Sequence, residues 1–214
     1  MLVASVVTVS LMLALRPVAR SVGLIDQPGG RKRHTGVVPL IGGIAIFFGV
    51  IAGVLIIGET DLASGSLLFA AALLIGVGVL DDIYTVRPIV RVLVQTSAIL
   101  LMYYAANLTL AGIGNPFGLG QIMLGPVALI GTVVVGITVI NAYNLIDGID
   151  GLAGTIVIIT LTALAIANGA GIATSIALVT IAAVLGFLIF NFPSEHNRRI
   201  RAFMGMPEAP SSDC

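Results

Sequence analysis

The sequence predicts an all-α fold: a polytopic integral membrane bundle of about seven transmembrane helices in one domain. Hydrophobic residues make up 58% of its 214 residues, charged residues make up 9%, and the mean hydropathy is +1.14. A soluble domain cannot bury that much apolar surface. The apolar residues also fall into runs of roughly the length that spans a bilayer, and short polar loops separate the runs.

Seven apolar runs are the expected spans. They cover residues 2–15, 38–57, 65–80, 89–107, 122–140, 152–168 and 172–192. The first run is short, so we expect its helix to extend past Arg16, whose long side chain can reach the membrane surface. No basic stretch precedes this run as it would in a signal peptide, which predicts that the run remains as a span.

The charged residues predict the orientation of the bundle. If seven spans alternate, the cations of the loops and of the C-terminal segment share one side: Arg31, Lys32, Arg33, Arg87, Arg91, Arg198, Arg199 and Arg201. The loops of the other side hold only Glu59 and Asp61. By the positive-inside rule the cation-rich side is cytoplasmic, with the N-terminus outside and the C-terminus inside.

Composition and charge placement argue against several classes of protein. A formal net charge of zero gives no reason to expect nucleic acid as a partner, and one cysteine, Cys214, excludes an intrachain disulfide. A transporter would need ionisable residues near the middle of the membrane. No carboxylate lies near the middle of a predicted span, so a transporter is the less favoured alternative.

Two adjacent acids, Asp81 and Asp82, close the third predicted span. The C-terminal end of a helix disfavours each carboxylate by about 0.3–1 kcal/mol, so we expect a compensating cation. A divalent metal would keep both neighbouring carboxylates ionised. The alternative is structural: Asp82 caps the next segment or pairs with Arg87 or Arg91.

A second polar cluster interrupts the apolar sequence at NAYNLIDGIDGLAG. Four polar residues recur there every three positions: Asn141, Asn144, Asp147 and Asp150. Such a row drifts around an α-helix, so the four converge only if the helix tightens or breaks, and Gly148 and Gly151 favour a break. The alternative is that they satisfy loop backbone, with Asp150 as N-cap of a helix that starts near Leu152.

Acids and amides at the same membrane surface indicate a hard cation held by oxygen ligands. Both clusters fall at the cytoplasmic ends of predicted spans under the orientation above. The chain has one Cys and only two His, which are the residues that zinc prefers. Mg2+ therefore fits this chemistry better than zinc.

Four motifs together resemble one enzyme family. They are GGRKRHTGVVPLIGG, LDDIYTVRP, NAYNLIDGIDGLAG, and FNFP followed by AFMG, in this order between about Leu24 and Gly205. These motifs resemble the polyprenyl-phosphate N-acetylhexosamine-1-phosphate transferases, the family that includes phospho-N-acetylmuramoyl-pentapeptide transferase. The RKRH and VPLIGG details are more similar to the branch that uses UDP-N-acetylglucosamine or a related UDP-sugar.

The resemblance implies transfer of a sugar 1-phosphate from a UDP-sugar to undecaprenyl phosphate, with release of UMP and with Mg2+, or Mn2+ in its place. It implies a multi-pass protein of the bacterial inner membrane whose active face is cytoplasmic, at the first membrane step of cell-surface glycan synthesis. Membrane lipid is a further implied partner, and a homodimer is left open. Direct attack by the lipid phosphate and a phospho-aspartyl intermediate both stay open.

The resemblance also implies roles for individual residues. Asp81 would deprotonate or orient the lipid phosphate, and Asp82 would lie beside the pyrophosphate and hold the metal together with Asp147. Asn144, Asp147 and Asp150 would hold the nucleotide. The implied catalytic set is Asp81, Asp82, Asp147 and Asp150. The implied substrate-binding set is Arg31, Lys32, Arg33, His34, Asn141, Asn144 and Phe203.

The basic loop has two interpretations. Arg31, Lys32 and Arg33 could act as topology anchors that contact anionic lipids, worth about 1 kcal/mol each near the surface. Within the motif RKRH followed by VPLIGG, the loop resembles a substrate-phosphate loop that leads into a glycine-rich helix start. His34 would then donate a hydrogen bond rather than bind a metal.

The C-terminal segment departs from the family pattern. Family members continue after AFMG with Asp-Ala-Gly-Ser and further spans, whereas this chain reads MPEAPSSDC over residues 206–214. We expect residues 1–205 to form an incomplete transferase domain and the tail to be frameshifted, because one base restored after the Gly205 codon permits Asp-Ala-Gly-Ser. The gene's shifted frame should then encode further spans. An inactive truncated fragment is the alternative to an active enzyme.

Overall fold

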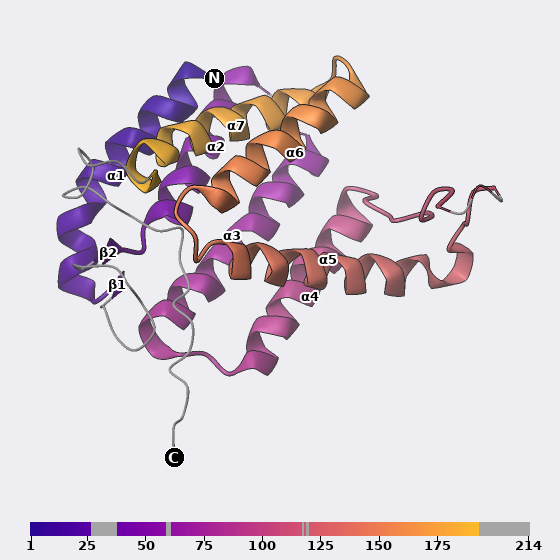
Figure 1. The fold of residues 1–214 in the computed structure, drawn as a ribbon, viewed down its shortest axis with the longest axis horizontal. Helices are drawn as coiled ribbons and strands as arrows, with labels where there is room; N and C mark the ends of the chain where they lie inside the picture. The colour runs from indigo at the N-terminus through magenta and orange to yellow at the C-terminus, as the bar shows by residue number, and fades with distance from the viewer. Residues whose placement is uncertain (27–37, 59–60, 117, 119, 193–214) are drawn as a thin grey trace. The chain divides into compact units, whose positions relative to one another are not determined.

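The computed structural model describes residues 1–26, 38–58, 61–116, 118 and 120–192 (Figure 1). The helices are α1 (Leu2–Val22), α2 (Gly42–Ile57), α3 (Leu62–Tyr84), α4 (Pro88–Ala105), α5 (Ala128–Ile146), α6 (Leu152–Asn168) and α7 (Ile172–Asn191). A short 3-10 turn, Gly125–Val127, precedes α5. Each helix coincides with one of the predicted apolar runs, which confirms the all-α fold.

Five helical segments of the described chain are long and apolar enough to cross a membrane. They are Leu2–Ala19, Leu62–Tyr84, Pro88–Ala105, Gly125–Ile146 and Ile172–Asn191. The remaining two, α2 and α6, are apolar but have only 16 and 17 residues. Helix α1 continues past Arg16 as expected, and the Arg16 guanidinium lies 5.4 Å from the centre of the Phe190 ring.

Two predicted boundaries were wrong because short backbone pairings replace the first turns of helix. Ile25–Asp26 (β1) pairs antiparallel with Val38–Pro39 (β2), so α2 begins at Gly42 rather than at residue 38. Residues 111–114 pair with residues 122–124, so α5 begins only after the Pro126 turn and runs to Ile146. Proline suits this position because a helix start needs no amide donor there.

The chain divides into two compact units. Unit 1 comprises Met1–Glu59, Gly78–Thr85 and Asn144–Cys214, and unit 2 comprises Thr60–Val77 and Val86–Tyr143. Within unit 1, helices α1, α2 and α7 pack against one another and α6 packs on α7 (Figure 1). The last turns of α3 and the last three residues of α5 belong to this unit.

Small residues bring the helices of unit 1 close together. A Cβ atom on Gly49 of α2 would lie 2.1 Å from Thr8 Oγ1 and 2.7 Å from the Ala4 carbonyl oxygen of α1. The buried Thr8 hydroxyl donates to the Ala4 carbonyl at 2.9 Å and lies 3.4 Å from the Ala45 carbonyl of α2. Such close backbone approach is typical of helix pairs in membranes, where packing rather than water drives association.

The core of unit 1 fixes the ends of several segments. Its buried residues are Met12, Ala19, Leu24, Leu40, Ile41, Ala45, Val184, Phe187, Leu188 and Phe190. Val79 and Ile83, one turn apart near the end of α3, pack against this core. Val157 and Ile158, near the start of α6, pack against it as well. One core therefore holds both the end of α3 and the start of α6.

Unit 2 has its own packing. Its helices line an apolar cavity of about 420 Å3 that involves residues such as Leu74, Ile99 and Val135. The buried Thr132 hydroxyl donates to the Ala128 carbonyl at 2.7 Å and accepts the Leu110 amide at 3.0 Å. The Thr132 hydroxyl thus joins the backbone at Leu110 to α5 and has both a donor and an acceptor as partners.

Candidate active site

Asp81 and Asp82 lie in the last turn of α3. The helix continues to Tyr84, and the Thr85 amide donates to the Asp81 carbonyl at 2.9 Å. Both acids are partly buried. Val79 and Ile83 pack against the core of unit 1, so the backbone between them is held in place. The Asp81 and Asp82 side chains extend from this backbone.

The residue after this helix adopts an unusual backbone conformation. Thr85 has a φ of 53°, in the left-handed region that β-branched residues rarely enter. The N-cap position of α4 is held by Arg87, whose side chain makes no cap hydrogen bond. The structural alternative for Asp82, a cap of the next segment or a pair with Arg87 or Arg91, stays a prediction.

The second acidic segment is a turn between α5 and α6. Helix α5 ends at Ile146, and Asp147–Asp150 form a turn in which the Ile149 amide donates to the Ile146 carbonyl at 3.2 Å. The predicted break of the helix and the helix start at Leu152 are both confirmed. The N-cap position of α6 is held by Gly151, so the alternative in which Asp150 caps this helix was wrong.

Gly151 is fixed on both sides of its backbone. Its amide donates to Asn191 Oδ1 at 2.6 Å, and its carbonyl accepts the Thr155 amide at 3.0 Å and the Thr155 hydroxyl at 2.6 Å. Gly151 has a φ of 75°, and a Cβ there would lie 3.2 Å from the Phe192 ring. Only glycine suits this position.

Asn191 is a residue that the motif analysis missed as a candidate. It is only 4% exposed and forms the last residue of α7. The signal was present in the sequence, since an asparagine ends an otherwise apolar span within FNFP. A buried amide in such a place needs specific hydrogen-bond partners.

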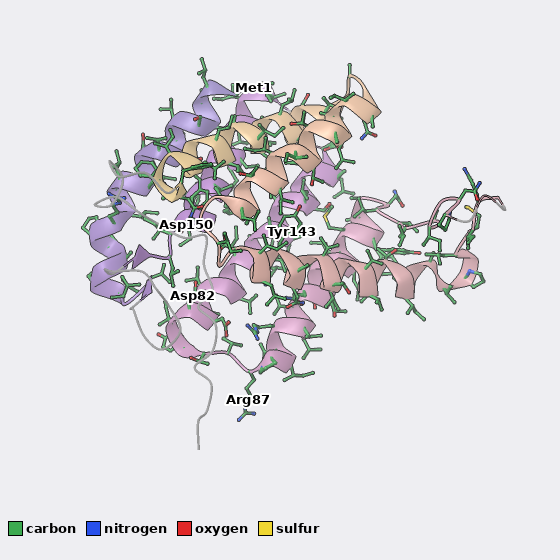
Figure 2. The ribbon with its side chains drawn as sticks, in the orientation of Figure 1. Met1, Asp82, Arg87, Tyr143 and Asp150 are labelled. Carbon is green, nitrogen blue, oxygen red and sulfur yellow. The ribbon has the colours of Figure 1, made fainter. Side chains whose placement is uncertain are left out.

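The structure brings all four predicted catalytic residues, and Asn144 of the substrate-binding set, into one unit. Asp81, Asp82, Asn144, Asp147 and Asp150 all belong to unit 1, and all five are partly buried. Figure 2 labels Asp82 near the end of α3 and Asp150 in the turn that precedes α6.

Asn141 differs from the other members of its row. It lies in α5 within unit 2, is exposed, and its amide nitrogen donates to Gln95 Oε1 at 3.1 Å and to the Ile137 carbonyl at 2.8 Å. Gln95 is only 2% exposed, so Asn141 satisfies a buried amide of α4. A substrate-binding role for Asn141 stays a prediction.

The remaining predicted substrate residues lie outside the described part of the chain: Arg31, Lys32, Arg33, His34 and Phe203. The described residues on either side of the basic loop are nevertheless fixed. The pairing of β1 with β2 and the Leu40 amide, which donates to the Leu24 carbonyl at 3.1 Å, join the two flanks of the loop. Leu24, Leu40 and Ile41 belong to the core against which Val79 and Ile83, the residues that flank Asp81 and Asp82, are packed.

The predicted metal ligands are carboxylates of unit 1, Asp82 and Asp147. No group of three or more His, Cys, Asp or Glu that could hold a metal occurs among the residues with described positions. Mg2+ does not require such a group, because it keeps several waters and is usually held by one or two carboxylates plus substrate phosphates. Partly buried carboxylates such as Asp82 and Asp147 fit that donor set in kind.

Comparison with known proteins now identifies the family. The profile of glycosyl transferase family 4 matches residues 64–206, which include Asp81, Asp82, the acidic turn and Asn191. The chain belongs to glycosyl transferase family 4. The resemblance drawn from the motifs is thereby confirmed at the level of the family.

The chain is also similar to individual transferases of known name. It is 38% identical over 95% of its length to a probable undecaprenyl-phosphate N-acetylglucosaminyl 1-phosphate transferase of Bacillus subtilis (strain 168), covering 57% of that protein. It is 34% identical over 92% of its length to the undecaprenyl-phosphate alpha-N-acetylglucosaminyl 1-phosphate transferase of Yersinia pestis, covering 55%. The counterpart of Escherichia coli (strain K12) is 33% identical over 89% of this chain, covering 52%. The chain thus spans about half the length of the curated relatives it matches.

Proposed function

We propose that the protein transfers a sugar 1-phosphate, N-acetylglucosamine 1-phosphate or that of a related N-acetylhexosamine, from a UDP-sugar to undecaprenyl phosphate. The observation behind this proposal is the match to the named transferases, in which the chain is 38% identical to the Bacillus subtilis relative over 95% of its own length. The placement of Asp81, Asp82, Asp147 and Asp150 in one compact unit supports it.

The reaction joins two phosphate groups. An oxygen of the lipid phosphate forms a bond to the sugar-bearing phosphorus of the UDP-sugar, and the bond from that phosphorus to the bridging oxygen breaks. UMP leaves with the electron pair, and the lipid keeps a pyrophosphate that bears the sugar. Such transfers depend on positioning and on neutralising charge rather than on covalent help from the protein.

The residues of unit 1 divide these tasks. Asp81 accepts a proton from the lipid phosphate or orients it, and Asp82 and Asp147 are the residues that would hold Mg2+, or Mn2+ in its place. A metal held there would supply positive charge that offsets the charge of the phosphate oxygens. Asn144 and Asp150 hold the nucleotide. The basic residues Arg31, Lys32 and Arg33, with His34, Asn141 and Phe203, complete the proposed substrate contacts.

The proposed setting is the bacterial inner membrane. The positive-inside distribution of cations supports a cytoplasmic active face, where UDP-sugars are made. Undecaprenyl phosphate would reach the acids from within the bilayer, and the UDP-sugar would reach them from the water phase. The product would feed cell-surface glycan synthesis.

The test is a transfer assay on membranes that contain this chain. With labelled UDP-N-acetylglucosamine, undecaprenyl phosphate and Mg2+, we expect UMP and a labelled lipid to appear in equal amounts. Asp81→Asn and Asp82→Asn should each lower turnover by about 100-fold or more, as for loss of a positioned acid or base. Asp61→Asn is the matched control, because Asp61 is an acid of unit 2 at the start of α3.

The outcomes separate the proposal from its alternatives. Equal amounts of UMP and labelled lipid, lost with EDTA and restored with Mg2+, support the transferase. Inserted wild-type chain that yields neither product contradicts activity of this chain and favours the inactive fragment. Near-normal turnover in Asp81→Asn or Asp82→Asn removes that residue from the catalytic set.

A further inference from the structure

Asn191 connects the end of α7 with the acidic turn. Its Oδ1 accepts the Gly151 amide at 2.6 Å across 40 positions of sequence, and both residues belong to unit 1. The bond is buried: Asn191 is 4% exposed, and Gly151 is buried as well. A hydrogen bond in such surroundings is stronger than one in water and costly to leave unmade.

The accepted N–H group belongs to the peptide that follows Asp150. A peptide unit is planar, so the direction of the Gly151 N–H also sets the direction of the Asp150 carbonyl and the torsion next to the Asp150 Cα atom. The two bonds from Thr155 to the Gly151 carbonyl fix the other side of Gly151. Asn191 and Thr155 thus restrain the backbone at the end of the turn from both sides of Gly151.

The position of Asn191 itself is well determined. Helix α7 is among the most buried helices of unit 1, with Phe187 fully buried and Leu188 8% exposed. A Cβ on Gly154 of α6 would lie 2.7 Å from Leu188 Cδ2, so α6 and α7 approach closely just beside the turn. The Phe192 amide donates to the Leu188 carbonyl at 2.9 Å, which keeps the end of α7 helical up to Asn191.

We propose that Asn191 is a positioning residue of the active site, which orients Asp150 and the acidic turn through the Gly151 amide. The proposal rests on the proposed function, because this turn is the segment assigned to the nucleotide and the metal. Asn191 contacts the turn backbone and acts through it. The role requires an acceptor oxygen at the δ position, which separates it from a role in packing.

The test reports on the order of the turn without requiring turnover. In a Cys214→Ser background, a nitroxide label is attached at Ile149→Cys, since Ile149 lies in the turn and is 60% exposed. A second preparation has the label at Ile166→Cys, at the far end of α6, where the native side chain is 79% exposed. Electron paramagnetic resonance then measures the mobile fraction at each site in the full chain in membranes.

Three variants address the acceptor oxygen. Asn191→Leu is similar in size but has no acceptor, and Asn191→Asp keeps one. Asn168→Leu is a matched control at the end of α6, where the Asn168 amide donates to the Leu164 carbonyl of its own helix at 2.8 Å. We expect Asn191→Leu to raise the mobile fraction at position 149 by about tenfold, the factor that corresponds to one buried hydrogen bond. Asn191→Asp and Asn168→Leu should give the wild-type spectrum.

Three results would overturn the proposal. The first is an unchanged spectrum at position 149 in Asn191→Leu, and the second is an Asn191→Asp spectrum as mobile as that of Asn191→Leu. The third is equal mobility at positions 149 and 166 in Asn191→Leu, which would mean that Asn191 supports the whole helix pair. Membranes that release no UMP would contradict the proposed function, and the line shapes would still decide the positioning role.

Discussion

Replacing Gly49 with alanine tests whether the close approach of α1 and α2 holds unit 1 together. The new Cβ would lie 2.7 Å from the Ala4 carbonyl oxygen and 2.1 Å from Thr8 Oγ1, where ordinary contact begins at 3.4 Å. The helix backbones must therefore move apart by about 0.7 Å, a gap that forfeits a quarter to a half of the dispersion energy of each affected contact. The Thr8 hydroxyl must also rotate away from its acceptor.

The expected magnitude follows from three terms. Overpacking of this kind costs about 1–3 kcal/mol, and an unsatisfied buried hydroxyl costs a further 1–3 kcal/mol or so. Alanine recovers about 1 kcal/mol through its higher helix propensity. We expect a net loss of about 3 kcal/mol, which lowers the melting temperature by about 6–12 °C for a chain of this length.

The measurement is thermal unfolding of the purified chain in detergent, with Gly65→Ala as the matched control. Gly65 lies in α3 of unit 2, and no described atom comes within 4 Å of a Cβ placed there. Gly65→Ala should therefore stabilise the protein by about 0.5–1 kcal/mol. Thr8→Ala should reduce the effect of Gly49→Ala in the double variant. Equal melting temperatures for Gly49→Ala and Gly65→Ala would refute the packing argument.

Three further predictions concern single positions. Gly151→Ala places alanine at a φ of 75° and Gly58→Ala places it at a φ of 80°, and each change costs about 1–2 kcal/mol. Gly151→Ala should lower the melting temperature more than Gly58→Ala does, because the Cβ at position 151 also meets the Phe192 ring. Thr85→Asn should raise the melting temperature by relieving about 1 kcal/mol of left-handed strain, since asparagine tolerates a φ of 53°; no change would show that Thr85 is not strained. The Ser64 hydroxyl and amide hold the pKa of Asp61 below its ordinary value, so the cap on α3 is fully stabilising above the ordinary Asp pKa and weakens as the pH falls through the lowered one. Asp61→Asn should cap the helix without that pH dependence, which thermal unfolding from neutral to acid pH would reveal.

The helices were predictable because each is apolar along nearly its whole length. Composition and run length are sufficient for such segments, as α6 and α7 show, whose bounds agree with prediction to within a residue. The start of α2 was not predictable in the same way. Val38 and Pro39 are as apolar as the helix that follows, and only their pairing with Ile25 and Asp26 removes them from it.

The candidate site was predictable in its residues and less so in their arrangement. Only 9% of the residues are charged, so acids at the ends of apolar spans were evident candidates for a functional site. Gly148 and Gly151 indicated the helix break that the structure has. The sequence did not indicate that Asn141 belongs to a different unit from Asn144, Asp147 and Asp150. Asn141 lies one helical turn before the break, where its partner Gln95 comes from a distant helix, and no local pattern encodes that contact.

The hairpin of α6 and α7 explains why a turn rich in glycine and acid can still be ordered. Glycine at positions 148 and 151 permits the break but adds conformational freedom that opposes a fixed site. The compensation comes from outside the turn, through the Asn191 amide and the Thr155 hydroxyl on Gly151 and the Phe192 ring beside it. Asn191 and Phe192 in turn depend on α7, whose Phe187 and Leu188 lie in the core against which Val79 and Ile83 of α3 pack. A substitution in that core should therefore disturb both acidic segments together, even where it contacts neither.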